Sequence, residues 1–174
     1  MKPEFDRKAL ITDSLTGVYN LQYLEKVLSW EVVRADRWRL PLTMLLLDID
    51  SFQRVNDMHG HLAGNTVLKS LAAILRSSVR PQDFVFRSGG DEFCIVLPSA
   101  DLNGGLLVRE RILGRIETSA LVPGLTGKVT VTIGVCKYEA GLGPSHFMVR
   151  AKEALLNAKR DRHDDESGIP VHLI

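Results

Sequence analysis

Two adjacent acidic residues, Asp91 and Glu92, begin an otherwise apolar segment that ends at Pro98. A carboxylate buried without a partner is costly, so this pair indicates a ligand or a cation nearby. Successive residues of a strand face opposite sides, and the two acids are therefore expected to serve different surroundings. A metal ion would account for one of them. The preceding Gly89 and Gly90 would let a phosphate chain come close to the backbone.

A second pair of acids, Asp48 and Asp50, follows the continuous apolar run of residues 42–47. Such a run is typical of a central strand that is buried on both faces. Acids at the C-terminal edge of a central strand lie where α/β folds usually place ligands. They could instead cap the next helix, which would account for one acid but less easily for both.

The pattern of the whole chain predicts an α+β fold, in which a sheet with antiparallel strands carries helices on its faces. Strand-like runs on both sides of the glycine pair predict a β-hairpin over residues 83–97, because glycine accepts the positive φ of a tight turn. A loop is expected at residues 59–64. The other expected elements are helices over 21–37, 51–58, 65–78, 102–118 and 145–160, a strand over 129–136, and an edge strand that residues 171–174 could add.

Composition limits the class of protein. At 174 residues, with 45% hydrophobic and 25% charged residues, the chain is expected to form one globular domain. The formal net charge of +1 does not suggest a nucleic-acid partner or contact with an anionic membrane surface. No apolar run approaches the roughly 20 residues that cross a bilayer, and the N-terminus lacks a signal peptide's apolar core, so a cytoplasmic location is expected. Cys94 and Cys136 each lie in an apolar run and are interpreted as reduced core thiols.

Residues 89–93 read Gly-Gly-Asp-Glu-Phe, and this run resembles the signature of the GGDEF domain of diguanylate cyclases. Residues 13–20 are similar to the opening motif of that family, and further blocks follow in the family's order over nearly the whole chain. The resemblance implies a nucleotidyl-cyclase, palm-like fold over residues 13–174. It also implies that residues 1–12 are a lead-in from an upstream segment. Sensor domains, phosphodiesterase (EAL) domains or both would be fused to the domain in the full-length protein.

The resemblance further implies that two GTP molecules are condensed to cyclic di-GMP with release of pyrophosphate. Mg²⁺ (or Mn²⁺) would be bound by Asp48, Asp91 and the backbone carbonyl of Ile49. Asp91 would also be the proton acceptor, with Glu92 assisting. Because each domain would hold one GTP while the product contains two nucleotides, catalysis would require a homodimer. The substrate-binding positions implied in the same way are Phe52, Gln53, Asn56, Asn65, Gly89, Gly90 and Lys159.

Four positions depart from the family's pattern. Gln53 stands where the family has a lysine, Asn65 where it has an aspartate, and His163 where it has an arginine. On the last helix Lys152 replaces an aspartate, and it could equally be a solvated surface lysine. A carboxylate accepts from both guanine donors, whereas an amide has one acceptor oxygen, so the change at position 65 is expected to weaken guanine binding by about 1–3 kcal/mol. His61, in the same block, is expected to serve local structure rather than to bind a metal.

Ahead of the hairpin, Arg80 and Asp83 resemble the family's inhibitory Arg-x-x-Asp site. There an arginine fork and a carboxylate would bind a guanine edge of the product. Arg109 or Arg111 could complete such a site. The simpler alternative is a helix-to-strand turn with a local salt bridge.

Two rival functions stay open. The first is a catalytically weak or inactive domain that binds GTP or cyclic di-GMP and regulates an adjoining EAL domain. The substituted positions favour this rival, whereas the intact Asp48 and residues 89–92 favour the enzyme. The second is a nucleotide cyclase or polymerase-like palm of another specificity, which shares the two-acid chemistry but predicts neither Asn56 nor the Arg80 motif.

Overall fold

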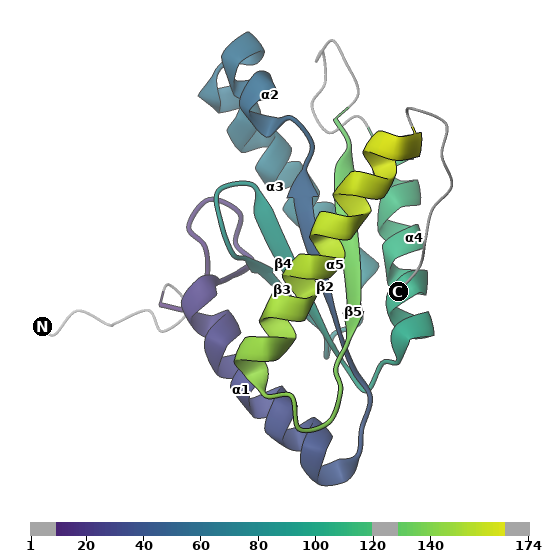
Figure 1. Ribbon diagram of the computed structural model, residues 1–174. Coiled ribbons are helices and arrows are strands. Elements are labelled where there is room, and N and C mark those ends of the chain that lie inside the picture. Colours follow the sequence, from purple (N-terminus) through teal and green to yellow (C-terminus); the bar gives the residue numbers. More distant parts are fainter. Residues whose placement is uncertain (1–9, 120–128, 166–174) are drawn as a thin grey trace, which may run out of the picture.

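The computed structural model describes residues 10–119 and 129–165, and these form a twisted sheet with helices on both faces (Figure 1). The sheet has five strands in the order β1-β3-β4-β2-β5. Every neighbouring pair is antiparallel except β1 with β3. The predicted mixed sheet and α+β class are confirmed. The strands are β1 (Tyr19–Asn20), β2 (Leu42–Ile49), β3 (Phe84–Arg87), β4 (Glu92–Pro98) and β5 (Val131–Lys137).

The helices divide between the two faces. α1 (Leu21–Trp38) and α5 (Pro144–Asp165) pack on one face, while α3 (His61–Ser78) and α4 (Leu102–Thr118) cover the other. The short α2 (Phe52–His59) lies beyond the end of β2, against α3 (Figure 1).

The central strand β2 explains why both faces are covered. Met44 and Leu46 belong to the core beneath α1 and α5, whereas Leu45 and Leu47 belong to the core beneath α3 and α4. All four side chains are fully buried, as the continuous apolar run predicted. Since β2 pairs with β4 on one side and β5 on the other, its last acids lie at the middle of the sheet's end.

The predicted loop over residues 59–64 is wrong. α3 begins at His61, so Gly60 alone separates α2 from α3. Gly60 has a φ of 81°, a left-handed conformation that glycine adopts without strain, and this lets the chain reverse within one residue. Asn65 consequently lies inside the first turns of a helix rather than at its start.

Two other features differ from the expected elements. The two-residue β1 was not predicted, and β5 begins two residues later than expected, at Val131. The expected edge strand over 171–174, most of the lead-in and the loop before residue 129 lie outside the described residues. Cys94 is buried and Cys136 is partly buried, both as free thiols, which agrees with the interpretation as core thiols. Burial raises the pKa of the Cys94 thiol, which keeps it protonated. Within the described parts of the chain, no helix has the length and apolar character needed to cross a membrane.

α5 reaches the sheet at one unusually close point. A Cβ added to Gly134 of β5 would overlap backbone atoms of Leu155 and Ala154 in α5. Backbone atoms cannot rotate away as a side chain can, so α5 has to be displaced if this position carries a larger residue. This packing sets how close the C-terminal half of α5 comes to the end of β2.

We therefore predict that Gly134→Ala destabilises the fold by about 3 kcal/mol, because overpacking forces α5 off the sheet. The matched control is Gly114→Ala in α4, where an added Cβ meets nothing within 4 Å. That change should stabilise the domain by up to about 1 kcal/mol, as alanine favours the helix. Chemical unfolding of both variants measures the difference. Equal stability of the two would show that α5 does not pack against β5 in this way.

Candidate active site

The turn between β3 and β4 is held by the strand backbone and by one arginine. The backbone N–H groups of Ser88 and Gly89 donate to the carbonyl of Glu92, at 3.0 and 3.3 Å. Arg87 donates from Nε and Nη2 to the carbonyl of Gly90, at 3.1 and 2.6 Å. The β-hairpin is as predicted, but the reason given for its glycines is wrong, because neither Gly89 nor Gly90 has a positive φ. A Cβ at Gly90 would meet nothing within 4 Å, so the backbone there is open to a ligand.

Arg87 also ties this turn to the segment before α1. Its Nη1 lies 3.2 and 3.3 Å from the two carboxylate oxygens of Asp13. Burial would raise the pKa of Asp13, but hydrogen bonds from Thr16 and from Arg87, together with the charge of Arg87, outweigh it and hold the pKa below its usual value. A single guanidinium therefore links two segments that the sequence separates by 74 positions.

The acids at the end of β2 divide into two roles. Asp50 accepts a hydrogen bond from the hydroxyl of Thr132 at 2.6 Å, which ties the loop after β2 to β5. Asp48 forms an ion pair with Lys159 of α5, with Nζ 3.0 Å from Oδ1. The N-cap position of α2 is held by Ser51, so helix capping does not explain either acid.

Asp48 and Asp91 lie close enough to influence each other. Burial raises the pKa of Asp48, the bond and charge of Lys159 oppose this, and the negative charges of Asp91 and Asp50 raise it further. Glu92 lies opposite Asp48 in the sheet register, and its carboxylate accepts a hydrogen bond from Ser88 at 2.8 Å. The two adjacent acids therefore do serve different surroundings, as expected. Ile49, the last residue of β2, has its side chain in the core.

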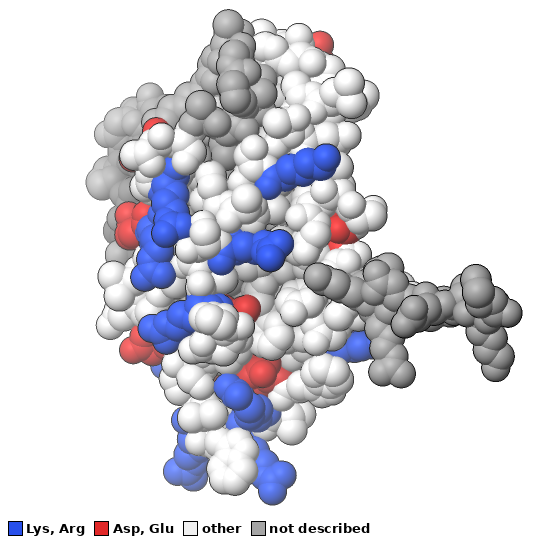
Figure 2. Space-filling view, turned by 180° about the vertical axis from the view of Figure 1, so that it is seen from behind, with Lys and Arg blue, Asp and Glu red and all other residues white. Residues whose placement is uncertain are grey.

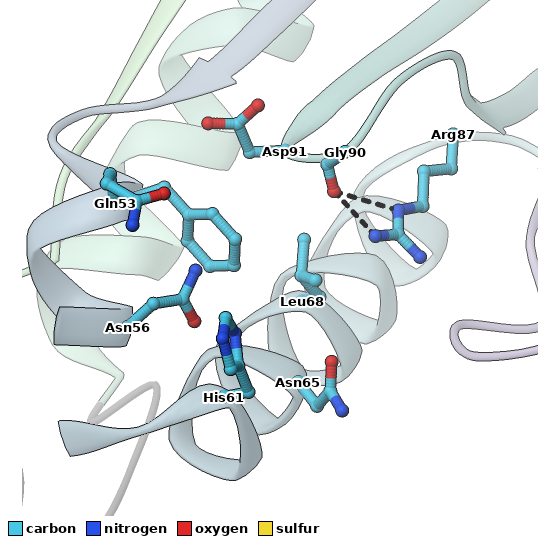
Figure 3. Close-up of a pocket in the computed structure, with 9 residues that line it drawn as sticks. Gln53, Asn56, His61, Asn65, Leu68, Arg87, Gly90 and Asp91 are labelled. Atoms are coloured by element: carbon cyan, nitrogen blue, oxygen red, sulfur yellow. Dashed lines mark hydrogen bonds between the residues drawn. The ribbon is translucent and has the colours of Figure 1, made fainter.

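A cavity of about 340 Å³ opens between the hairpin turn, α2 and α3 (Figure 3). Most of its wall comes from positions that the sequence indicated, and the structure adds His61, Leu68 and Arg87. Gly89, Asp48 and Lys159 are not part of this wall. The lining residues are Phe52, Gln53, Asn56, His61, Asn65, Leu68, Arg87, Gly90 and Asp91.

Gly64 of α3 positions Asn56 in this wall. A Cβ at Gly64 would overlap the side-chain oxygen of Asn56 and crowd the ring of Phe52. The missing side chain lets α2 lie against α3, and Asn56 then faces the cavity (Figure 3). The spacing of Gly60 and Gly64 was the available signal for this close approach.

The structure describes the surroundings of three of the four positions that depart from the family's pattern. Gln53 donates from its amide to Asp57, one turn further along α2, at 2.8 Å. Asn65 lines the cavity, and Lys152 is an exposed residue of α5. The side chain of His163 lies outside the described residues.

Arg80 and Asp83 lie in the turn that joins α3 to β3, away from the cavity. The backbone N–H of Arg80 donates to Asp83 Oδ2 at 2.8 Å, and the N–H of Asp83 donates to the Arg80 carbonyl at 3.0 Å. Burial raises the pKa of Asp83, while the charges of Arg80 and Arg111 oppose it. Arg111 donates to the carbonyl of Ser78 at 2.9 Å, so it does lie beside this turn, whereas Arg109 pairs with its neighbour Glu110.

The profile described as "Diguanylate cyclase, GGDEF domain" matches residues 10–165 of this sequence. The chain belongs to the GGDEF family. It is 38% identical over 162 residues to the diguanylate cyclase DgcP of Pseudomonas aeruginosa, covering 92% of this chain and 24% of that protein. It is 35% identical over 159 residues to the diguanylate cyclase DosC of Escherichia coli K12, covering 90% of this chain and 35% of that protein.

Solved GGDEF structures share the fold. The diguanylate cyclase SiaD of Pseudomonas aeruginosa, in complex with its activator SiaC, superimposes with a TM-score of 0.83 at 36% identity, over 88% of this chain and 59% of that one. The coiled coil and GGDEF domain of DgcB from Caulobacter crescentus, in complex with c-di-GMP, gives a TM-score of 0.84 at 27% identity, over 88% and 83%. The GGDEF chain spans about a quarter to a third of the length of the two curated relatives.

We predict that Asp13→Asn lowers the free energy of unfolding by about 1–2 kcal/mol at pH 7, because it removes the charge that faces Arg87. The folded-state pKa of Asp13 is depressed, so its contribution is present above the unfolded pKa and is lost as the pH falls through the folded value. The difference between wild type and variant should therefore shrink below about pH 4. Denaturant unfolding across this pH range measures it.

The control for that series is Asp101→Asn. Asp101 caps α4 by accepting from the N–H of Gly104 at 2.8 Å, and asparagine caps a helix equally well. This variant should stay within about 0.5 kcal/mol of wild type at pH 7. A pH-independent cost for Asp13→Asn would contradict the ion pair with Arg87.

Proposed function

We propose that this GGDEF domain condenses two molecules of GTP to cyclic di-GMP and releases pyrophosphate. The observation that carries the proposal is the position of the glycine turn. It holds Asp91 within electrostatic reach of Asp48 and at the edge of a cavity of about 340 Å³. A triphosphate needs such a combination of open backbone, paired carboxylates and space for a base.

The donor set fits Mg²⁺ (or Mn²⁺). Asp48 and Asp91 carry hard oxygen ligands, and a divalent cation would relieve the repulsion between their charges. The backbone carbonyl of Ile49, the last residue of β2, would be a third ligand. No cluster of three or more His, Cys, Asp or Glu side chains suited to a metal occurs among the described residues. Mg²⁺ is often held by one or two carboxylates together with substrate phosphates, so two acids suffice. The bound ion would neutralise charge on the triphosphate.

In this proposal, different groups of the domain would bind the base, face the phosphates and take part in the reaction. Asn56 and Asn65 would bind the base, between the apolar Phe52 and Leu68. The backbone of Gly89 and Gly90 would face the phosphates. Asp91 would accept the proton of the ribose 3′-hydroxyl as its oxygen attacks the α-phosphorus of the other nucleotide. Glu92 would assist Asp91 indirectly, through its hydrogen bond with Ser88 in the turn.

Lys159 would contribute a cation beside the phosphates. In the free domain its ammonium group neutralises Asp48, and it comes from α5 rather than from the cavity wall. With Asp48 holding a divalent cation, the ammonium group of Lys159 would be free to bind a phosphate oxygen.

The product contains two nucleotides, so two domains have to face each other with one nucleotide each. A twofold homodimer suits the symmetric product. Since the chain spans a quarter to a third of its curated relatives, we propose that sensor or EAL domains in the full-length protein bring two copies together. We also propose that the domain is cytoplasmic, because its substrate would be GTP.

A second candidate is a domain that binds guanine nucleotides and regulates an adjoining EAL domain without forming product. Gln53 favours it, because its neutral amide is bound to Asp57 where a phosphate-binding cation is expected. If this candidate is right, the domain binds guanine nucleotides but forms no product at any protein concentration.

We predict that the protein incubated with GTP and Mg²⁺ forms cyclic di-GMP, and that Asp91→Ala lowers the rate by roughly 100-fold or more through loss of the proton acceptor. Chromatography of the nucleotides measures the product. Asp91 makes no hydrogen bond among the described residues, so the fold should survive, and the thermal midpoint checks this. Glu110→Ala on the exposed side of α4 removes a matched charge and should leave the rate unchanged. Full activity in a folded Asp91→Ala protein would remove Asp91 from the reaction.

We also propose that the product binds at Arg80 and Asp83. The charges of Arg80 and Arg111 both act on Asp83, so the three groups lie close together. Several Lys and Arg side chains are exposed on the face of the molecule that Figure 2 shows. A guanidinium can donate to the O6 and N7 edge of guanine, and a carboxylate can accept from its amino group. The Arg80 guanidinium forms no ion pair with Asp83 among the described residues, so the local salt bridge of the simpler alternative is absent there.

The corresponding prediction is that Arg80→Ala weakens binding of cyclic di-GMP, without metal, by about tenfold or more. Calorimetry measures the affinity. Arg76→Ala, an exposed arginine one turn earlier on α3, is the matched control and should bind as wild type does. Equal affinity of Arg80→Ala and Arg76→Ala would refute the assignment.

A further inference from the structure

The uncharged polar side chains of the cavity wall share one property. Gln53, Asn56 and Asn65 are amides, and His61 is an imidazole that in its neutral form carries one donor and one acceptor. Each of these groups can therefore either donate or accept a hydrogen bond. Among the described residues that line the cavity, Asp91 is the one side chain that only accepts hydrogen bonds.

The two charged side chains of the cavity wall, Arg87 and Asp91, already interact with other groups of the protein. The guanidinium of Arg87 binds the carbonyl of Gly90 and the carboxylate of Asp13. Asp91 lies on the hairpin turn and acts electrostatically on Asp48, at the reaction end. Both groups therefore have partners at the hairpin turn, in the segment before α1 or at the end of β2.

The two asparagines, by contrast, are free to bind. Neither side chain makes a hydrogen bond within the described residues, and both line the cavity, one from α2 and one from α3 (Figure 3). The amide of Gln53 already donates one hydrogen bond to Asp57, which leaves its oxygen and its second N–H group for a further partner.

Guanine and adenine differ in the direction of these hydrogen bonds. The base-pairing edge of guanine presents an acceptor and two donors, whereas that of adenine presents one donor and one acceptor. A carboxylate accepts from both guanine donors and repels the acceptor nitrogen of adenine. An amide satisfies either base, because a half-turn of its terminal bond exchanges its oxygen and its NH₂ group. An acceptor-only group is what a pocket needs to reject adenine.

We propose that this pocket does not discriminate strongly between the two purines, so that the domain uses ATP as well as GTP and forms a mixed cyclic dinucleotide beside cyclic di-GMP. This inference rests on the proposed condensation. The 3′-oxygen of each nucleotide bonds to the α-phosphorus of the other, and the α–β phosphoanhydride bond of each is broken. One ATP and one GTP thus yield one mixed product, two pyrophosphates and two protons. The residue that sets this selectivity is Asn65.

The test begins with binding. GTP and ATP analogues with a methylene group between the α and β phosphorus atoms cannot react, and both are titrated in Mg²⁺ against wild type and Asn65→Asp. The wild-type dissociation constants should agree within about fivefold, because an amide binds either base. Asn65→Asp should prefer the guanine analogue by about tenfold or more. Asn103→Asp, on α4 at the opposite end of β4 from the turn, adds the same charge away from the cavity and should keep the wild-type ratio.

Product analysis completes the test. Wild type given equal ATP and GTP should form the mixed product, and Asn65→Asp should form mainly cyclic di-GMP. A wild-type preference for the guanine analogue above about 30-fold, or an unchanged ratio in Asn65→Asp, overturns this inference alone. Similar binding of both analogues without any product overturns the condensation and leaves the pocket assignment standing. Binding of neither analogue overturns both.

Discussion

The guanidinium of Arg87 is the interaction on which the site depends. Arginine presents its donors in a rigid fork, and here the fork joins the carbonyl of Gly90 to the carboxylate of Asp13. The turn of the hairpin is thus fastened to the segment that leads into α1. The backbone bonds of Ser88 and Gly89 to Glu92 hold the turn as well, and the pairing of β4 with β2 places Glu92 opposite Asp48. Arg87 adds the one link from this turn to the segment before α1 that the described side chains make, and so helps to fix Asp91 near Asp48.

A second constraint is the negative charge that accumulates at the end of the sheet. Asp48 is partly buried and feels both Asp91 and Asp50, so its pKa is raised even with a lysine beside it. Lys159 can reach Asp48 only because α5 lies directly on β5, at a glycine that leaves no space for a side chain. Packing at Gly134 and electrostatics at Asp48 are therefore coupled. A site that retains this repulsion without a ligand is suited to a cation and a triphosphate.

The sequence allowed the main helices, the central strand and the hairpin to be predicted, because each carries a periodic pattern or a turn signal that acts over a few residues. The family resemblance also implied that Asp48 and Asp91 lie together, since a sheet can place a strand end beside a hairpin turn. Other features have no local signal. A two-residue β1 is too short for any periodicity, and the contact of Arg87 with Asp13 joins distant segments. The chain passes from α2 to α3 at Gly60 alone, whereas a loop of six residues was predicted there.

In the proposed reaction, the chemistry and the choice of base lie on different parts of the fold. Condensation involves the ribose 3′-oxygen and the α-phosphorus, which are the same in every ribonucleoside triphosphate. The hairpin turn and the end of β2 would act on these atoms, whichever base the nucleotide carries. The base would contact the junction of α2 and α3, where Gly64 lets the two helices lie together and Asn56 and Asn65 line one cavity. We therefore expect a substitution at position 65 to change the nucleotide that is used without moving Asp48 or Asp91. In this proposal, selectivity depends on the side-chain chemistry of two neighbouring helices rather than on the hairpin turn.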